Sequence, residues 1–265
     1  MARSSLKNIA ELIKAQQNNQ PVEQKFLREL KKSIELSDEK NSRLPSKTYK
    51  PSSLNCPRNM YYQVIGAEPT DTSSNYCLVG ICESGTDRHE RIQNAVADMC
   101  NNDFDCEYVD VEKYVKSRNL KDVEVISKQG NETKLYHKTL NISFLCDGII
   151  RYQGRYYIIE FKTESVYKWN ARLAVAPEHK NQAFCYSMAL GIDEVIFVYI
   201  NRDNCDMKSY LLTVTDKDKQ SILEKIEYCD QYVKILTPPP VTSSSPELSK
   251  ACKYCNYATR CRKDG

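Results

Sequence analysis

Alternation between hydrophobic and polar positions predicts two strands and a tight turn in the middle of the chain. Residues 148–152 and 156–161 are two apolar runs of β character separated by a short Gln-Gly turn, which is the pattern of a β-hairpin. Successive side chains of a strand point to opposite faces. We therefore expect Glu160 and Lys162 to share one face of the second strand and Phe161 to point to the other.

Hydrophobic patterns on both sides of this hairpin predict helices and further strands. After a glycine-bearing loop, a helix is expected over residues 80–99 with His89 on its apolar face, and a β-rich block begins near Asp122. The elements expected after the hairpin are a helix over 179–191, strands over 194–200 and 208–214, and a helix over 218–236. This order is typical of an α/β fold in which helices flank a mixed central sheet.

The two ends of the chain have patterns different from this central region. Helical spacing of apolar residues recurs in two groups near the start, which are Leu6, Ile9 and Ile13, and then Val22, Phe26, Leu30 and Ile34. Near the other end, the sequence TPPPVTSSSPELSK is typical of an extended linker. We therefore expect an N-terminal helical attachment over 1–48, a core over 49–236, and a linker with a cysteine-rich segment over 237–265.

Composition and charge are those of an ordinary globular protein. Of the 265 residues, 41% are hydrophobic and 28% are charged, which is enough for one substantial core. The formal net charge of +3 allows a local basic groove for nucleic acid without requiring one. No apolar run approaches membrane-spanning length, and the N-terminus lacks the apolar core of a signal peptide. We expect an intracellular, cytoplasmic protein with no membrane partner.

Three of the twelve cysteines form a pattern that indicates metal binding. Cys252, Cys255 and Cys261 have the spacing C-x2-C-x5-C in a short polar segment, which has too few apolar residues to fold by burial alone. A fourth ligand must come from elsewhere, and Cys56 is the natural candidate because the linker allows the C-terminal segment to return to it. Zinc and an iron–sulfur cluster both accept four thiolates, so the spacing does not separate them.

The hairpin carries a second candidate site. Asp147 stands at the start of the first strand, where the hairpin can fold it toward Glu160 and Lys162. Two carboxylates bind a hard divalent cation, which activates water and neutralises phosphate, and a nearby lysine stabilises the developing negative charge. The pattern therefore predicts a metal-dependent phosphodiesterase, although a solvated edge hairpin with one charged face has the same sequence signature.

Six motifs occur along the chain in a recognisable order. They are the C-P-R-x-x-Y-like context of Cys56, the H-E pair at His89, the D-G-I at Asp147, the E-F-K-T that begins at Glu160, the Q-x-x-x-Y of Gln182 and Tyr186, and the C-terminal C-x2-C-x5-C. Together they resemble the RecB-like branch of the PD-(D/E)XK nuclease superfamily, in particular the small CRISPR-associated exonucleases and AddB-type nuclease domains. The resemblance covers about residues 52–262, and cysteine replaces the proline before Asp147.

This resemblance implies a restriction-endonuclease-like core closed by a four-cysteine metal cluster. The cluster would be [4Fe–4S], or alternatively Zn²⁺, held by Cys56, Cys252, Cys255 and Cys261. A catalytic Mg²⁺ or Mn²⁺ would be held by Asp147, Glu160 and the backbone carbonyl of Phe161, with His89 completing or extending the site. Lys162 would stabilise the transition state, and Gln182 and Tyr186 would position the nucleophile or the DNA.

The function that the resemblance implies is a DNA exonuclease that prefers single strands or free ends. Candidate phosphate contacts are Arg58, Arg88, Arg151, Arg155 and Lys168. The alternatives are a zinc- or cluster-stapled, structure-specific endonuclease and a non-catalytic nucleic-acid or protein-interaction module on the same fold. Homo-oligomers, and partners in recombination, CRISPR or phage replication, stay open.

Overall fold

A computed structural model describes residues 21–40, 46–71, 75–241 and 252–265. The chain forms two compact units, a small one from residues 1–43 and 72–83 and a larger one from residues 44–71 and 84–265. The first predicted helical group, Leu6, Ile9 and Ile13, lies outside the described residues. Among the helices of the described ranges, none is long and apolar enough to span a membrane.

The small unit contains the second predicted helical group. Helix α2 (Val22–Lys40) and the first residues of α4 (Tyr76–Ala97) meet where the backbone N–H of Tyr76 donates to Glu35 at 3.4 Å. Lys31 also lies 4.7 Å from the centre of the Tyr76 ring. The helical periodicity is thus confirmed for α2, although several of its apolar side chains, such as Phe26, are exposed within this unit.

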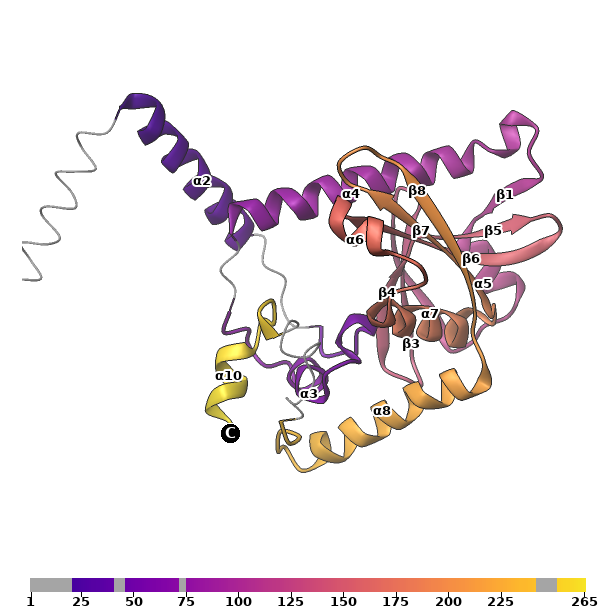
Figure 1. The fold of residues 1–265 in the computed structure, drawn as a ribbon. Helices are drawn as coiled ribbons and strands as arrows, with labels where there is room; N and C mark the ends of the chain where they lie inside the picture. Colours follow the sequence, from indigo (N-terminus) through magenta and orange to yellow (C-terminus); the bar gives the residue numbers. More distant parts are fainter. Residues whose placement is uncertain (1–20, 41–45, 72–74, 242–251) are drawn as a thin grey trace, which may run out of the picture. The chain divides into compact units, whose positions relative to one another are not determined.

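The larger unit is built on a mixed five-stranded sheet, which confirms the α/β prediction (Figure 1). Its strands are β1 (Cys106–Val109), β5 (Gly148–Tyr152), β6 (Arg155–Glu164), β7 (Glu194–Asn201) and β8 (Met207–Thr213), and their order in the sheet is β1-β5-β6-β7-β8. Only β6 and β7 are parallel. A parallel pair requires a crossover connection, which α6 (Val166–Ala171) and α7 (Pro177–Leu190) provide.

The predicted hairpin is formed by β5 and β6. Gln153 and Gly154, at its turn, have φ angles of 48° and 77°. Two consecutive positive φ angles characterise the turn whose twist matches that of the flanking strands. The register pairs Gly148 with Ile159. A Cβ atom on Gly148 would lie 2.5 Å from the Tyr108 hydroxyl, so this position of the D-G-I motif requires glycine.

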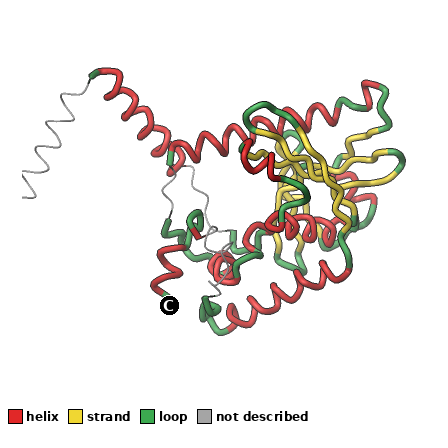
Figure 2. Tube along the Cα trace, in the orientation of Figure 1, coloured by secondary structure: helices red, strands yellow, loops and turns green. Residues whose placement is uncertain are grey.

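A second, three-stranded antiparallel sheet leads directly into the first. Its strands are β2 (Val123–Gln129), β3 (Glu132–His137) and β4 (Ile142–Cys146), in the order β2-β3-β4. Asp147 is the single residue between β4 and β5. The two sheets are therefore joined at one of the predicted catalytic residues, and both appear as yellow strands in Figure 2.

Helices cover both faces of the five-stranded sheet (Figure 1). On one face, α7 and α8 (Asp216–Lys234) contribute residues such as Ala183 and Ile222 to a core with Ile158. On the other, Ile92 of α4 packs on a cluster that contains Phe161. The other helices that the structure describes in this unit are α3 (Pro57–Val64), α5 (Val111–Ser117) and α10 (Ala258–Lys263), with short 3-10 turns at Pro51–Ser53 and Cys100–Asn102.

Helix α4 corrects one predicted boundary. It begins at Tyr76 rather than at residue 80, so the residues before Gly80 that were predicted as a loop belong to the helix, and it ends at Ala97. A Cβ atom at Gly80 or at Gly85 would meet nothing within 4 Å. Each glycine lowers helix stability by only about 1 kcal/mol relative to alanine, which is too little to end a helix of this length.

Candidate functional site

The register of the hairpin brings Asp147 and Glu160 together. Because Gly148 pairs with Ile159, the next position outward places Asp147 across from Glu160. The backbone N–H of Phe161 donates to Oδ2 of Asp147 at 2.7 Å, which fixes this carboxylate. The predicted convergence of the two acidic side chains is therefore present in the structure.

Glu160 and Lys162 share a face of β6, as the alternation predicts. Nζ of Lys162 lies 2.5 Å from Oε1 of Glu160. Glu160 is 3% exposed and Asp147 is 6% exposed. The other oxygen of Glu160, Oε2, is buried and has no hydrogen-bond partner among the described residues. Buried carboxylate oxygens are costly without a partner, so this atom is oriented for a ligand that the protein does not supply.

The electrostatics of this pair also indicate a missing positive charge. Burial raises the pKa of Asp147 to about 6 and that of Glu160 to about 7. The charge of Asp147 further raises the pKa of Glu160, whereas Lys162 lowers the pKa of both. One ammonium group therefore does not balance two buried carboxylates, and a divalent cation would restore both to their ionised form.

His89 reaches the same place from α4. Its Nδ1 lies 4.0 Å from Oδ2 of Asp147, and its ring is half-buried beside Phe161, with ring centres 6.2 Å apart. Burial is the main cause that lowers the pKa of His89. The neutral imidazole that results is the form that binds metal ions.

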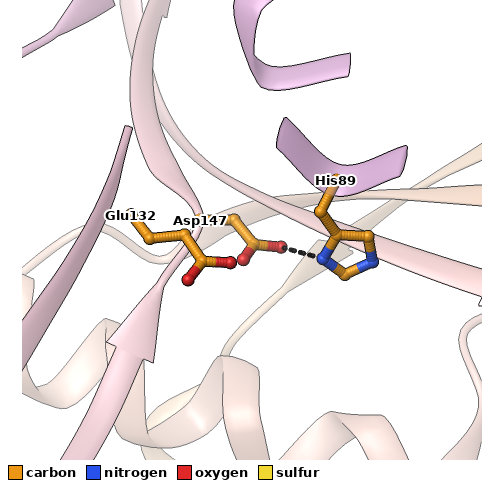
Figure 3. A group of neighbouring side chains, drawn as sticks. All are labelled: His89, Glu132 and Asp147. Atoms are coloured by element: carbon orange, nitrogen blue, oxygen red, sulfur yellow. Dashed lines mark ion pairs between the residues drawn. The ribbon is translucent and has the colours of Figure 1, made fainter. Parts of the chain in front are cut away.

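A third acidic residue, Glu132, joins this group. His89, Glu132 and Asp147 each offer a ligand atom, and these three atoms all lie within 4.8 Å of one another. In Figure 3, the carboxylates of Glu132 and Asp147 lie side by side and the His89 ring points toward Asp147. Glu132 was not among the predicted site residues, because the Gln-Gly-Asn-Glu segment at 129–132 is typical of a polar turn. Strand register brings it to the site, since Thr133 pairs with Cys146 and the next position places Glu132 beside Asp147.

Tyr186 and Gln182 lie on α7, behind the site. Tyr186 is fully buried, and its hydroxyl donates to the carbonyl of Leu145 at 2.8 Å. Burial raises the pKa of Tyr186 well above its ordinary value. Its hydroxyl thus fixes β4 two residues before Asp147. Gln182 is half-buried one turn earlier on the same helix, and the predicted catalytic roles of both residues stay predictions.

A second histidine near the site was not predicted. His179 stacks on Phe197 and Tyr199, and its Nδ1 lies 3.0 Å from the Tyr199 hydroxyl. Parallel register places these two aromatic residues beside Glu160 and Lys162 on β6. Burial, followed by the charge of Lys162, lowers the pKa of His179 to about 3.

The predicted phosphate contacts separate into exposed and buried residues. Arg151 and Arg155 are exposed and pair with glutamates at 3.8 and 2.6 Å, and Lys168 is exposed as well. Arg88 is half-buried. Arg58 corrects the prediction, because it is 4% exposed and donates to the carbonyls of Cys261, Asp264 and Gly265. The C-terminal segment covers α3 and removes Arg58 from the surface.

The four predicted cysteine ligands line one cavity. Cys56 immediately precedes α3. Together with Cys252, Cys255 and Cys261 it lines a cavity of about 300 Å³. Tyr62 and Tyr257 complete the wall, with ring centres 5.4 Å apart. Among the described residues, only His89, Glu132 and Asp147 have three ligand atoms within 4.8 Å of one another. The four sulfurs therefore surround the cavity rather than meeting at one point.

Hydrogen-bond donors lie next to three of these sulfurs. Backbone amides of Arg58 and Asn59 hydrogen-bond to Cys56, and that of Tyr257 hydrogen-bonds to Cys255. These amides lower the pKa of each thiol, whereas burial, the larger effect, raises it. Nη1 of Arg58 also lies 3.6 Å from Sγ of Cys261. Amide donors and a guanidinium are partners for negatively charged sulfur.

Polar contacts hold the C-terminal segment against the core. The amides of Thr70 and Asp71 donate to the carbonyl of Asn256 at 2.8 and 3.0 Å. The Asp71 carboxylate accepts from the backbone N–H and the hydroxyl of Thr259 at 2.8 and 2.7 Å. The hydroxyl of Tyr62 donates to Asp264 at 2.7 Å. This segment therefore reaches the predicted position next to Cys56.

Comparison with known proteins gives structural similarities at low sequence identity. No protein-family model matches the sequence, and the search of curated proteins gives no match. The crystal structure of SSO0001 aligns with a TM-score of 0.47 and 16% identity, over 87% of this chain and 95% of that chain.

Two structures of LHK-Exo also align. LHK-Exo in complex with dAMP has a TM-score of 0.43 and 13% identity, over 71% of this chain and 89% of that chain. The alkaline exonuclease LHK-Exo from Laribacter hongkongensis has a TM-score of 0.39 and 11% identity, over 77% of this chain and 95% of that chain. Scores and identities this low do not assign a function, so the function must rest on the site residues themselves.

Proposed function

We propose that this protein is a divalent-cation-dependent nuclease. Its catalytic site, formed by Asp147, Glu160 and Lys162, would hydrolyse phosphodiester bonds of DNA. The observation that carries the proposal is Oε2 of Glu160, a buried carboxylate oxygen without a hydrogen-bond partner among the described residues. It lies beside a second buried carboxylate and a lysine. A purely structural site has no reason to keep this arrangement, because leaving a buried charge uncompensated lowers stability.

The residues fit a hard divalent cation with oxygen ligands. Mg²⁺ or Mn²⁺ would be held by Asp147, Glu160 and the backbone carbonyl of Phe161, with His89 beside them. When bound, the cation would neutralise charge on the phosphate and make a neighbouring water more acidic.

The protein's own groups position the reaction. The amide of Phe161 fixes the Asp147 carboxylate, and Oε1 of Glu160 holds Lys162 in place at 2.5 Å. Lys162 is then preorganised to stabilise negative charge as it develops on the phosphate, which is an electrostatic contribution that needs no rearrangement during the reaction. Tyr186 acts as a positioning residue through Leu145, and Gln182 contacts the nucleophile or the DNA backbone.

We also propose a preference for single-stranded DNA with free ends, and the surface next to β6 supports the single-strand part of this proposal. Helix α6 begins two residues after β6, and its Tyr167 is 84% exposed beside the exposed Lys168. Exposed aromatic rings stack on unpaired bases, and adjacent lysines contact phosphates. We propose that a single strand binds along α6, with Tyr167 stacking on a base and Lys168 contacting a phosphate, as it reaches Lys162.

The cysteine cavity is proposed to hold a structural [4Fe–4S] cluster. In a tetrahedral zinc site, Zn–S bonds of about 2.3 Å place the sulfurs about 3.8 Å apart. In an iron–sulfur cluster each cysteine binds a different iron, so the sulfurs stand further apart. The arrangement of Cys56, Cys252, Cys255 and Cys261 around a 300 Å³ cavity favours the cluster. Its role would be to staple α3 to the C-terminal segment.

The proposed activity is tested with end-labelled linear DNA, single- and double-stranded, and with circular DNA, each in Mg²⁺ and in Mn²⁺. We expect stepwise degradation of linear single strands by the wild type and none by Glu160→Gln. Cleavage of circular DNA would instead indicate an endonuclease. If neither cation supports cleavage of any substrate, or if Glu160→Gln cleaves as well as the wild type, the proposed site is wrong.

A further inference from the structure

A groove at one end of the five-stranded sheet has no role in the proposed function. Its lining residues come from the end of α5, the start of β6, the end of α7 and the segment that leads into β7. Its volume is about 590 Å³, which is in the usual range for sites that bind small molecules.

This groove is separate from the proposed catalytic site. Tyr156 of β6 lines it, and period-two alternation places Tyr156 on the same face of the strand as Glu160 and Lys162. Tyr156 and Lys162 stand near opposite ends of β6, and their separation along the strand is about 20 Å. A ligand in the groove therefore does not touch the residues that we assign to catalysis.

Arg118 is a cation of this groove that lacks an acidic partner. It follows the last residue of α5, and its side chain is exposed. Its guanidinium carbon lies 5.6 Å from the centre of the Tyr114 ring and 5.4 Å from that of Tyr156. Within the described ranges, no carboxylate lies at ion-pair distance from Arg118. Two aromatic rings thus hold a guanidinium whose charge no acidic side chain balances.

The acidic residues of the groove already have cationic partners. Glu194 pairs with Arg155 at 2.6 Å, and Asp193 pairs with Lys219 at 2.7 Å. These two pairs leave the charge of Arg118 unbalanced. A guanidinium presents its N–H groups as a planar fork that matches the oxygens of a phosphate. The groove is therefore suited to an anionic group at Arg118.

The rest of the lining is largely aromatic and apolar. Tyr156 and Leu120 are half-buried, so part of each side chain is open to the groove. Leu190 and Ile192 line the same groove and are almost fully buried, on either side of the glycine that ends α7. Aromatic side chains stack on nucleobases, whereas a small inorganic anion gains nothing from such a surface.

We propose that this groove binds a nucleotide, with its phosphate on the guanidinium of Arg118 and its base against Tyr156 and Leu120. The nucleotide is either free in solution or one unit of a DNA strand, since both present the same base and phosphate. An acidic peptide would satisfy the charge of Arg118 but has no planar base, so the lining favours a nucleotide. The inference goes beyond the proposed function and does not depend on it.

The experiment measures binding of dTMP and of a ten-residue oligothymidylate to the full-length protein by isothermal titration calorimetry, without divalent cations. We expect saturable binding of at least one probe. Arg118→Gln should weaken it about tenfold or more, because a charge-assisted contact to phosphate is lost. Arg118→Lys should recover part of the affinity, since it keeps the charge but not the planar fork.

The matched control is Lys116→Gln, which changes an exposed lysine of α5 that pairs with Glu112 and does not line the groove. This variant should bind both probes as the wild type does. Binding of dTMP would assign the groove to a free nucleotide, and binding of the oligothymidylate alone would assign it to a DNA strand. Circular dichroism of each variant establishes that the fold is intact.

Further probes test the two halves of the ligand separately. Thymidine, which lacks the phosphate, and inorganic phosphate, which lacks the base, should each bind at least tenfold more weakly than dTMP. For the strand, the corresponding probe is an abasic strand of the same length. Equal affinity for the complete probe and for the one without a base would overturn the assignment to a nucleotide.

The remaining outcomes separate this inference from the proposed function. Absence of saturable binding of either probe, or equal affinity in Arg118→Gln and the wild type, would overturn the nucleotide site, as would tighter binding of an acidic decapeptide. None of these results bears on cleavage at Lys162. Conversely, Glu160→Gln should bind dTMP in the groove as the wild type does, whether or not the proposed nuclease activity is found.

Discussion

The β5–β6 hairpin and the cysteine segment are two candidate metal sites built in opposite ways. Asp147 and Glu160 are placed by strand register inside a sheet that buries its own core on both faces. Cys252, Cys255 and Cys261 lie in a short segment that depends on polar contacts with α3 and residues 70–71. In the first case the fold creates the site, and in the second we infer that the metal creates the local fold.

This difference predicts opposite consequences when a ligand residue is lost. A change in the hairpin should abolish chemistry and leave stability equal or higher, because it removes a buried charge. A change in the cysteine cluster should release the C-terminal segment and act on activity only indirectly.

The largest effect is expected for Lys162→Met, which removes the ammonium group but keeps most of the aliphatic stem. Loss of one preorganised group that stabilises phosphate charge typically lowers kcat about 100- to 1,000-fold, which single-turnover cleavage of linear DNA measures. The affinity for Mn²⁺ should be unchanged or higher because a positive charge has gone, and calorimetry measures this affinity. Lys134→Met, at an exposed position of β3, is the control. A loss of less than tenfold would contradict the role of Lys162.

The second prediction concerns Cys56→Ser. Anaerobically purified wild type should contain about four irons per chain, whereas the variant should lose most of its iron. Hydrogen exchange of residues 252–265 should then accelerate, while exchange in β6 and β7 stays slow, because the sheet has its own core. Cys100→Ser changes an exposed cysteine and should keep the iron. Iron in the variant equal to that of the wild type, or zinc in place of iron, would refute the proposed cluster.

The third prediction is a pH dependence of stability in EDTA. The folded-state pKa values of Asp147 and Glu160 are raised to about 6 and 7 from ordinary values of 3.8 and 4.5. Between about pH 4 and pH 7 the folded protein therefore holds more protons than the unfolded chain, so the free energy of unfolding falls as pH rises, by about 1.4 kcal/mol per pH unit for each extra proton.

Urea unfolding of the wild type and of an Asp147→Asn, Glu160→Gln double variant isolates this contribution. The difference in the free energy of unfolding between the two should grow in favour of the double variant as pH rises from about 4 to about 7. Saturating Mn²⁺ should stabilise only the wild type at the upper end of that range. Curves that run parallel over the whole range would show that these two groups do not titrate as the site requires.

The smallest effect is expected for Tyr186→Phe. The variant leaves the carbonyl of Leu145 without its 2.8 Å donor, which should cost about 1 kcal/mol of folding free energy. Cleavage should fall only severalfold if the hydroxyl positions β4 rather than contacting the substrate. Tyr167→Phe, at an exposed position, should keep the wild-type stability. A thousandfold loss of kcat in Tyr186→Phe with normal stability would indicate a direct catalytic role instead.

Local patterns predicted the parts of the structure that depend on neighbouring residues. Period-two alternation and the Gln-Gly turn specified the β5–β6 hairpin, and with it the approach of Asp147 to Glu160 and Lys162. The apolar stripe of α4 was predicted through Ile92, which packs on the sheet. These features follow from steric rules that act over a few residues.

Features that depend on distant pairing could not be predicted in the same way. Glu132 reaches the site only through its register with β4 and through the Tyr108 hydroxyl, and neither contact leaves a local pattern. Arg58 was predicted at the surface because nothing in its own segment shows that residues 261–265 cover it. The approach of Cys56 to the C-terminal cysteines was predicted because three cysteines leave one position of a four-ligand metal site unfilled. This requirement for a fourth ligand acts over a long distance in the sequence.

We propose that Oε2 of Glu160, which is buried and has no hydrogen-bond partner within the described ranges, binds a catalytic cation. Wild type and Glu160→Gln are compared at a pH above 7 and without DNA, and the rise in melting temperature on adding Mn²⁺ is measured for each. The same samples are then assayed for cleavage of linear single-stranded DNA. We expect Glu160→Gln to be at least as stable as the wild type without cation, to gain less stability from Mn²⁺, and not to cleave DNA. A variant that gains as much stability from Mn²⁺ as the wild type and still degrades DNA would contradict this proposal.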